Sequence, residues 1–271
     1  MKKLTYSLLS MLLIAACSAP TKEKAAEETV ATPVGDVQYS TDSTNMKGYF
    51  ALDQSNTTKR PGILVVHEWW GHNDYARERA DMLADLGYVA FAMDMYGEGK
   101  IAEHPDDAGK FTQEVMSNID EAKARFESAL NTLKAHPNVD PEKIGAIGYC
   151  FGGSVVLSMA NAGFDLDAVA AFHAGLGLPI QPETGAVKTR VLVANGADDP
   201  FIPEQQVEDF KRVMDAAGVD YKYIAYPGAV HSFTSKYADE MGAKFNMPLA
   251  YQPEADSASW AEMQALFKAT F

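Results

Sequence analysis

Cysteine is scarce in this sequence: among its 271 residues, only Cys17 and Cys150 carry a thiol. At most one disulfide can form, so a network of cross-links is excluded as the source of stability. Hydrophobic residues make up 47% of the chain, which is enough for a sizeable core. We therefore expect one large domain that is stabilised by burial of apolar side chains.

Positive charge is also in short supply, with 23 Lys and Arg residues against 37 Asp and Glu residues and a net charge of −14. An acidic surface of this kind argues against nucleic acid as a partner. Of the six histidines, four have no metal-ligand spacing with one another or with a cysteine, and we expect them on the surface or in loops: His67, His72, His104 and His136. No metal is predicted.

A hydrophobic run long enough to span a membrane is missing at the amino terminus, which reads MKKLTYSLLSMLLIAACSAP. Two lysines precede a short apolar stretch that ends at Ala16, a pattern typical of a secretory signal. The letters LIAAC resemble the bacterial lipoprotein box, which implies cleavage after residue 16 and acyl chains on Cys17. The alternative is an ordinary signal peptide that is cleaved nearby. Removal of residues 1–16 also removes Lys2 and Lys3 and takes the net charge from −14 to −16.

The segment after the signal, residues 17–36, has no aromatic residue and no apolar run. We predict a flexible tether that joins the lipidated Cys17 to a domain at 37–271. Several acyl chains hold a protein on a membrane stably. The protein is thus expected to be exported and lipid-anchored on a bacterial membrane, facing the periplasm. With Cys17 acylated, Cys150 has no disulfide partner and needs another reason to be present.

Apolar runs of strand length alternate with helical patterns through residues 37–271. Strands are predicted at 48–53, within 61–71, and at 88–97, 143–150, 167–175, 190–200 and 221–228, and helices at 74–87, 111–135, 152–162, 203–217 and 254–268. Several of the strands are continuously apolar, which indicates burial on both faces. The pattern predicts an α/β fold: a mostly parallel sheet with helices on both faces, in three layers.

The turn at GYCFGG, residues 148–153, joins a predicted strand to a predicted helix. Glycines two residues before and after Cys150 fit the nucleophile elbow G-x-S-x-G, with sulfur in place of the hydroxyl. Cys150 would sit at the amino end of the helix, where free N–H groups and the helix dipole favour a thiolate. The alternative is a buried structural cysteine in a tight joint between strand and helix.

Downstream residues supply partners for a nucleophile in the chain order nucleophile, acid, histidine. The segment VLVANGADDPFIP carries Asp198 and Asp199 after an apolar strand, and YPGAVHSF carries His231 after another. Of the two histidines that follow Cys150, only His231 comes after the acidic pair. His173 ends a predicted strand, where it either lines the pocket or packs.

Five segments carry a resemblance to the dienelactone hydrolase family of α/β hydrolases, from about residue 46 to the carboxyl terminus: HEWWG at 67–71, DMYGEG at 94–99, GYCFGG at 148–153, GADDPFIP at 196–203 and HSF at 231–233. The resemblance implies an α/β-hydrolase fold with Cys150 as nucleophile, His231 as general base and Asp199 as acid. Asp199 is preferred to Asp198 because the family's acid directly precedes the position of Pro200.

The same resemblance gives Glu68 contact with the thiol and control of its ionisation. It gives Trp69 and Phe151 the backbone N–H groups of the oxyanion hole, which stabilise charge on the carbonyl oxygen. The expected activity is hydrolysis of a small ester or lactone through a thioester, without a cofactor. Trp69 and Trp70 either wall the pocket or pack in the core.

One departure from the family concerns the substrate. Two family arginines that grip a substrate carboxylate correspond to Glu98 and Ser235 in this sequence, and neither binds an anion as a guanidinium does. Lys100 or Lys236 could compensate. An anionic dienelactone is therefore not the expected substrate.

Two other classes of function fit parts of the sequence. A tethered binding protein could keep the fold without the chemistry, although the triad positions and Glu68 hold chemically competent residues. A thiol redox protein is disfavoured because no C-x-x-C pair and no resolving cysteine are present. A monomer is expected.

Overall fold

The computed structural model describes Met1 and residues 34–271. The predicted signal peptide at 1–16, the lipid site at Cys17 and the tether up to residue 33 lie outside the described residues, so the membrane anchor stays a prediction. Within the described part of the chain, no helix is both long enough and apolar enough to cross a bilayer.

The domain is built on one sheet of eight strands, in the order β1-β2-β4-β3-β5-β6-β7-β8. The strands are β1 (Gly35–Ser40), β2 (Asn45–Ala51), β3 (Arg60–Val66), β4 (Val89–Met93), β5 (Val139–Tyr149), β6 (Ala168–Phe172), β7 (Arg190–Gly196) and β8 (Tyr221–Tyr226). β2 pairs antiparallel with β1 and β4, and all pairs from β4 to β8 are parallel. The predicted mostly parallel sheet is confirmed, and its seven predicted strands correspond to β2–β8.

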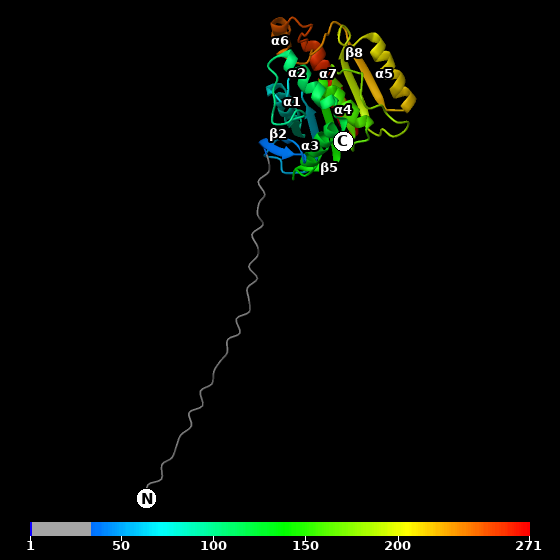
Figure 1. The fold of residues 1–271 in the computed structure, drawn as a ribbon. Coiled ribbons are helices and arrows are strands. Elements are labelled where there is room, and N and C mark those ends of the chain that lie inside the picture. The colour runs from blue at the N-terminus through cyan, green and yellow to red at the C-terminus, as the bar shows by residue number, and fades with distance from the viewer. Residues whose placement is uncertain (2–33) are drawn as a thin grey trace. The chain divides into compact units, whose positions relative to one another are not determined.

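Helices lie on both sides of this sheet (Figure 1). They are α1 (Asp74–Asp85), α2 (Pro105–Met116), α3 (Ile119–Lys134), α4 (Phe151–Asn161), α5 (Glu204–Ala217), α6 (Ala238–Phe245) and α7 (Pro253–Thr270). Apolar side chains of α2, α3, α4 and α5 share one core with the sheet, and those of α1 and α7 share a second. Because β3–β7 meet apolar side chains on both faces, their sequences are almost continuously hydrophobic.

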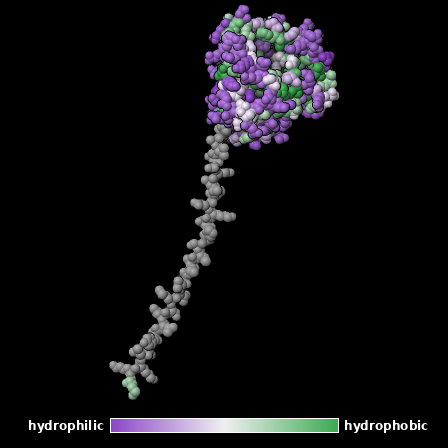
Figure 2. Space-filling view, in the orientation of Figure 1, coloured by the Kyte–Doolittle hydropathy of each residue, from purple (hydrophilic) through white to green (hydrophobic). Residues whose placement is uncertain are grey.

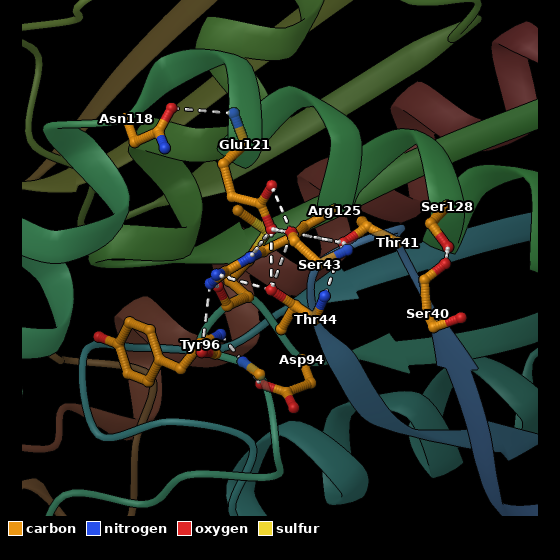
Figure 3. A network of polar contacts seen from close by, with 12 residues as sticks. Ser40, Thr41, Ser43, Thr44, Asp94, Tyr96, Asn118, Glu121, Arg125 and Ser128 are labelled. Atoms are coloured by element: carbon orange, nitrogen blue, oxygen red, sulfur yellow. Dashed lines mark hydrogen bonds and ion pairs between the residues drawn. The ribbon is translucent and has the colours of Figure 1, made fainter.

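The predicted helix over 111–135 is wrong in one respect, since the structure has two helices there. α2 ends at Met116, and the side chain of Asn118 accepts a hydrogen bond from the backbone N–H of Glu121 at 3.2 Å, which caps the start of α3 (Figure 3). The apolar periodicity continues across this break, so periodicity alone did not reveal it. β1 and α6 were not predicted, and β1 begins at Gly35, inside the range assigned to the tether.

A polar network ties the β1–β2 turn to α3 and to the loop after β4 (Figure 3). Thr44 Oγ1 donates to Glu121 at 2.9 Å, and Arg125 forms an ion pair with Glu121 at 3.0 Å. Arg125 also donates to the carbonyl oxygens of Met95 and Tyr96, at 2.9 and 3.1 Å. The network thus fixes a loop that borders the carboxyl ends of the central strands.

Candidate active site

Cys150 occupies a strained turn between β5 and α4. Its backbone has φ +53° and ψ −115°, a conformation that residues other than glycine rarely adopt. A Cβ on Gly148 would lie 2.1 Å from the carbonyl oxygen of Gly152, and a Cβ on Gly152 would lie 2.3 Å from that of Val66. Positions 148 and 152 must therefore both be glycine. The half-buried thiol of Cys150 is held above the edge of the sheet.

Asp199 and His231 lie in the loops after β7 and β8, and the structure brings them together. Nδ1 of His231 donates to Oδ2 of Asp199 at 2.7 Å, and both residues are buried. Asp198 is exposed at the turn, so of the two candidate acids only Asp199 holds the imidazole.

The charge on His231 depends on both of its partners. Burial lowers the pKa of His231, but the thiolate charge of Cys150 and hydrogen bonds with Asp199 and Cys150 outweigh burial and raise the pKa to about 10. At neutral pH this arrangement favours the imidazolium form of His231, which lies between Asp199 and Cys150.

Four of the predicted site residues line a single cavity of about 380 Å³: Trp69, Cys150, Phe151 and His231. The other walls are largely apolar, and no Lys, Arg, Asp or Glu of the described chain lines the cavity. Hydrophilic residues dominate the face of the molecule drawn in Figure 2, whereas the lining of this cavity is largely apolar. Phe151 is the first residue of α4, and its N–H has no partner within the helix.

The two tryptophans of the HEWWG segment have different surroundings. Trp69 borders the cavity, and its carbonyl oxygen accepts a hydrogen bond from the Tyr96 hydroxyl at 2.8 Å. Trp70 is buried, with its ring stacked against Phe245 at 5.9 Å. Of the two alternatives left open for this pair, Trp69 takes the pocket wall and Trp70 takes core packing.

Glu68 lies behind His231, outside the main cavity. Its carboxylate accepts a hydrogen bond from Ser232 Oγ at 2.9 Å and lies 4.0 Å from Nε2 of His173. Burial raises the pKa of Glu68, and the bond from Ser232 opposes that rise. The expected contact between Glu68 and the thiol of Cys150 is not among the hydrogen bonds of residues 34–271.

The backbone at Glu68 is held by its neighbour His67. The buried imidazole of His67 accepts from the Met95 N–H through Nε2 at 3.1 Å, so the proton is on Nδ1, which donates to the carbonyl oxygen of Glu68 at 2.5 Å. Burial lowers the pKa of His67, which keeps this tautomer neutral. His67 therefore fixes the loop that carries Glu68 and Trp69; it lies in that loop, directly after β3, and is buried there, not at the surface.

His173 is fully buried and does not line the cavity. Its Nε2 lies 2.7 Å from Thr234 Oγ1, and its ring centroid lies 5.3 Å from that of His231. The packing alternative for His173 therefore matches the structure.

Arg79 is a buried residue near the site that the sequence analysis missed. From α1 it donates to the carbonyl oxygen of Thr234 and forms an ion pair of 2.8 Å with Asp256 on α7. It thereby holds the loop that carries His231. The signal was an arginine beside Ala76 and Ala80 on the apolar face of α1.

Glu98 and Ser235, which the resemblance places at the positions of two family arginines, do not line the cavity. Glu98 is exposed and accepts from Asn45 Nδ2 at 3.3 Å, whereas Ser235 is buried in the loop after His231. Lys100 and Lys236 do not line the cavity either. No group of three or more His, Cys, Asp or Glu side chains in the described part of the chain is arranged to hold a metal ion.

Comparison with known proteins gives consistent relatives. The model of the dienelactone hydrolase family matches residues 46–271. Protein usf of Aquifex pyrophilus is 32% identical over 238 residues, which cover 86% of this chain and 96% of the relative.

Two solved structures also resemble the chain closely. A protein titled m3DLH is 37% identical with a TM-score of 0.82, over 87% of this chain and 97% of the other. A dienelactone hydrolase-like promiscuous phosphotriesterase from metagenomic libraries is 34% identical with a TM-score of 0.80, over the same shares. The α/β-hydrolase fold predicted from the sequence is thereby confirmed.

Proposed function

This chain belongs to the dienelactone hydrolase family, and we propose that it hydrolyses neutral carboxylic esters or lactones through a Cys150-His231-Asp199 triad. The observation that carries the proposal is the bond of 2.7 Å between His231 and Asp199 beside a thiol on a strained elbow. A carboxylate that fixes the histidine tautomer, next to a nucleophile, is the arrangement that acyl transfer requires.

The reaction would proceed in two acyl transfers. The thiolate of Cys150 attacks the carbonyl carbon, the bond to the alcohol oxygen breaks, and His231 gives its proton to that oxygen. Water then attacks the thioester while His231 takes its proton, and the acid leaves as the thiolate returns. Asp199 keeps the imidazole oriented and stabilises its positive charge in both steps.

We assign stabilisation of the negative carbonyl oxygen to the backbone N–H groups of Trp69 and Phe151. Both residues border the cavity, and Phe151 opens α4, where the helix dipole adds positive potential. Donors of this kind contribute about 10²–10³ in rate each.

The cavity supports a neutral substrate. No Lys or Arg of the described residues lines it, and the imidazolium of His231 is already paired with Asp199, so the carboxylate of an anionic dienelactone would lose water without gaining a free cation as partner. The phosphotriesterase relative makes a neutral phosphotriester a reasonable second substrate for the same nucleophile. The proposal also includes a lipid anchor at Cys17, which rests on the sequence.

The test compares the wild type with Cys150→Ala on p-nitrophenyl acetate, a neutral lactone, an anionic dienelactone and a neutral phosphotriester. We expect turnover of the neutral esters, at most weak turnover of the anionic lactone, and a loss of about 10⁴-fold or more in the variant. Circular dichroism and Tm check that the variant is folded. Undiminished turnover by Cys150→Ala would refute the mechanism.

Two alternative functions give different results in this assay. A ligand-binding protein with a hydrolase fold would turn over none of the substrates and bind one of them tightly. A thiol redox protein would reduce a disulfide substrate and leave esters intact, but it would have to do so without a second thiol in the described chain.

A further inference from the structure

A second hollow adjoins the catalytic cavity. It is a groove of about 520 Å³ between α5 and the segment 176–182 that follows β6. The cavity and the groove share two lining residues, Gly177 and Gln206. Oε1 of Gln206 accepts a hydrogen bond from the N–H of Leu176 at 3.0 Å, which holds this side chain at the boundary. The two spaces therefore lie next to each other, on either side of Gly177 and Gln206.

The floor of the groove is apolar. Four of its lining residues are hydrophobic and at least 93% buried: Leu176, Leu178, Phe210 and Met214. At the rim, the charges of Asp209 and Arg212 pair with each other at 2.9 Å. The groove thus offers hydrophobic contact to a ligand and no unpaired charge at its rim.

One residue that lines the groove has a polar atom without a partner. Asn161, at the end of α4, is 5% exposed, and its Nδ2 donates to the carbonyl oxygen of Ile180 at 3.0 Å. Its Oδ1 is buried without a hydrogen bond. Since the bond to Ile180 fixes which end of the amide is which, an acceptor is left over, and such an acceptor is costly unless a donor fills the place.

We propose that this groove is a second substrate subsite, which receives the end of the substrate that lies farthest from the scissile ester. The substrate class is an ester with an apolar chain of several carbons that carries a hydroxyl or amide N–H toward its far end. The chain runs past Gln206 over the apolar floor, and its donor bonds Oδ1 of Asn161. This inference rests on the proposed function, because it places the ester carbonyl at Cys150.

The test replaces a groove residue that does not border the catalytic cavity. Val213 lines the groove from α5, so Val213→Trp fills it. Glu208→Trp introduces the same side chain at an exposed position of α5 that lines neither the groove nor the cavity, and serves as the matched control. The substrates are p-nitrophenyl acetate, decanoate and 10-hydroxydecanoate, together with decyl acetate and 10-hydroxydecyl acetate for the alcohol side.

The substrates form two series, one that lengthens the acyl chain and one that lengthens the alcohol. In at least one series we expect the kcat/KM of the wild type to be higher for the ten-carbon substrate than for p-nitrophenyl acetate, and higher still for the ten-carbon substrate with a terminal hydroxyl. Val213→Trp should lower the ratio of long-chain to acetate kcat/KM at least tenfold, and Glu208→Trp should preserve that ratio. Asn161→Leu should remove the advantage of the hydroxyl, about five- to tenfold. An unchanged ratio in Val213→Trp for both series would overturn the subsite.

Binding separates failure of the subsite from failure of the proposed function. 10-Hydroxydecanamide is titrated into Cys150→Ala by calorimetry, with and without Val213→Trp. Binding that Val213→Trp weakens at least tenfold supports the groove even if the wild type hydrolyses no ester. Binding that is absent, or indifferent to Val213→Trp, refutes the groove even if acetate is turned over.

Discussion

His231 and His173 lie in the loops after β8 and β6, both buried, with ring centroids 5.3 Å apart, yet their surroundings favour opposite charge states. His231 bonds a carboxylate and faces a thiol, and its pKa rises to about 10. His173 bonds the hydroxyl of Thr234; burial lowers its pKa well below the usual range, and the positive charge of His231 lowers it further. Burial alone disfavours the imidazolium, so the partner decides the charge.

The different charge states of His173 and His231 fit different roles for the two residues. The neutral His173 adds no second cation beside the imidazolium of His231, and its Nε2 lies 2.7 Å from Thr234 Oγ1 in the loop that carries His231. In the proposed mechanism, the histidine that exchanges protons with the thiol is His231, the one that a carboxylate orients. Changes that exchange or remove these partners test this interpretation.

The largest expected effect comes from removing the carboxylate of Asp199, the partner that His231 has and His173 lacks. Asp199→Asn should lower kcat by about 10⁴, because the amide favours the wrong tautomer and no longer stabilises the imidazolium. Asp198→Asn is the control, since Asp198 is exposed in the same turn and should stay within threefold of the wild type. Equal losses in the two variants would show that the pairing with His231 is not what activates the site.

The smaller effect concerns stability and has opposite signs for the two histidines. An unfolded histidine has a pKa near 6.5, and the folded-state pKa of His173 lies well below that value. The neutral form of His173 therefore contributes stability above about pH 6.5, and this contribution is lost as the pH falls toward the folded-state pKa. The folded-state pKa of His231 is raised to about 10, so its contribution is complete below about 6.5 and is lost as pH rises toward 10.

Urea unfolding of the wild type, His173→Gln and His231→Gln from pH 5 to 10 measures both contributions. The gap in unfolding free energy between the wild type and His173→Gln should shrink on the acid side, with a slope of at most about 1.4 kcal/mol per pH unit. The gap for His231→Gln should shrink on the alkaline side. If the differences in unfolding free energy for His173→Gln and His231→Gln both shrink toward acid pH, or both toward alkaline pH, the assigned charge states are wrong.

The sequence predicted those parts of the site that depend on local pattern. Glycines around Cys150 reflect a turn that admits no Cβ at those positions, and the loops of Asp199 and His231 directly follow apolar strands of a parallel sheet. The chain order nucleophile, acid, histidine and the family resemblance then predicted that the three residues meet. β1 escaped prediction because it is a half-exposed edge strand whose sequence, GDVQYS, contains no apolar run.

Other features depend on packing between distant parts of the chain and have no local signature. The direction of the Glu68 carboxylate follows from the hydroxyl of Ser232, 164 residues away, and the ion pair of Arg79 reaches Asp256, 177 residues away. The apolar cavity is likewise assembled from several separate loops and helices. The resemblance placed Glu98 and Ser235 where the family has arginines and so predicted a loss of anion binding, but only the structure shows that no Lys or Arg of the described chain lines the cavity.

The most direct measurement is mass spectrometry of the protein quenched in acid during turnover of p-nitrophenyl acetate. A thioester mechanism predicts one acetyl group per chain, located on the peptide that contains Cys150, released by neutral hydroxylamine and absent from Cys150→Ala. An acetyl group on a different side chain, such as Ser154, with turnover intact in Cys150→Ala, would contradict a cysteine nucleophile.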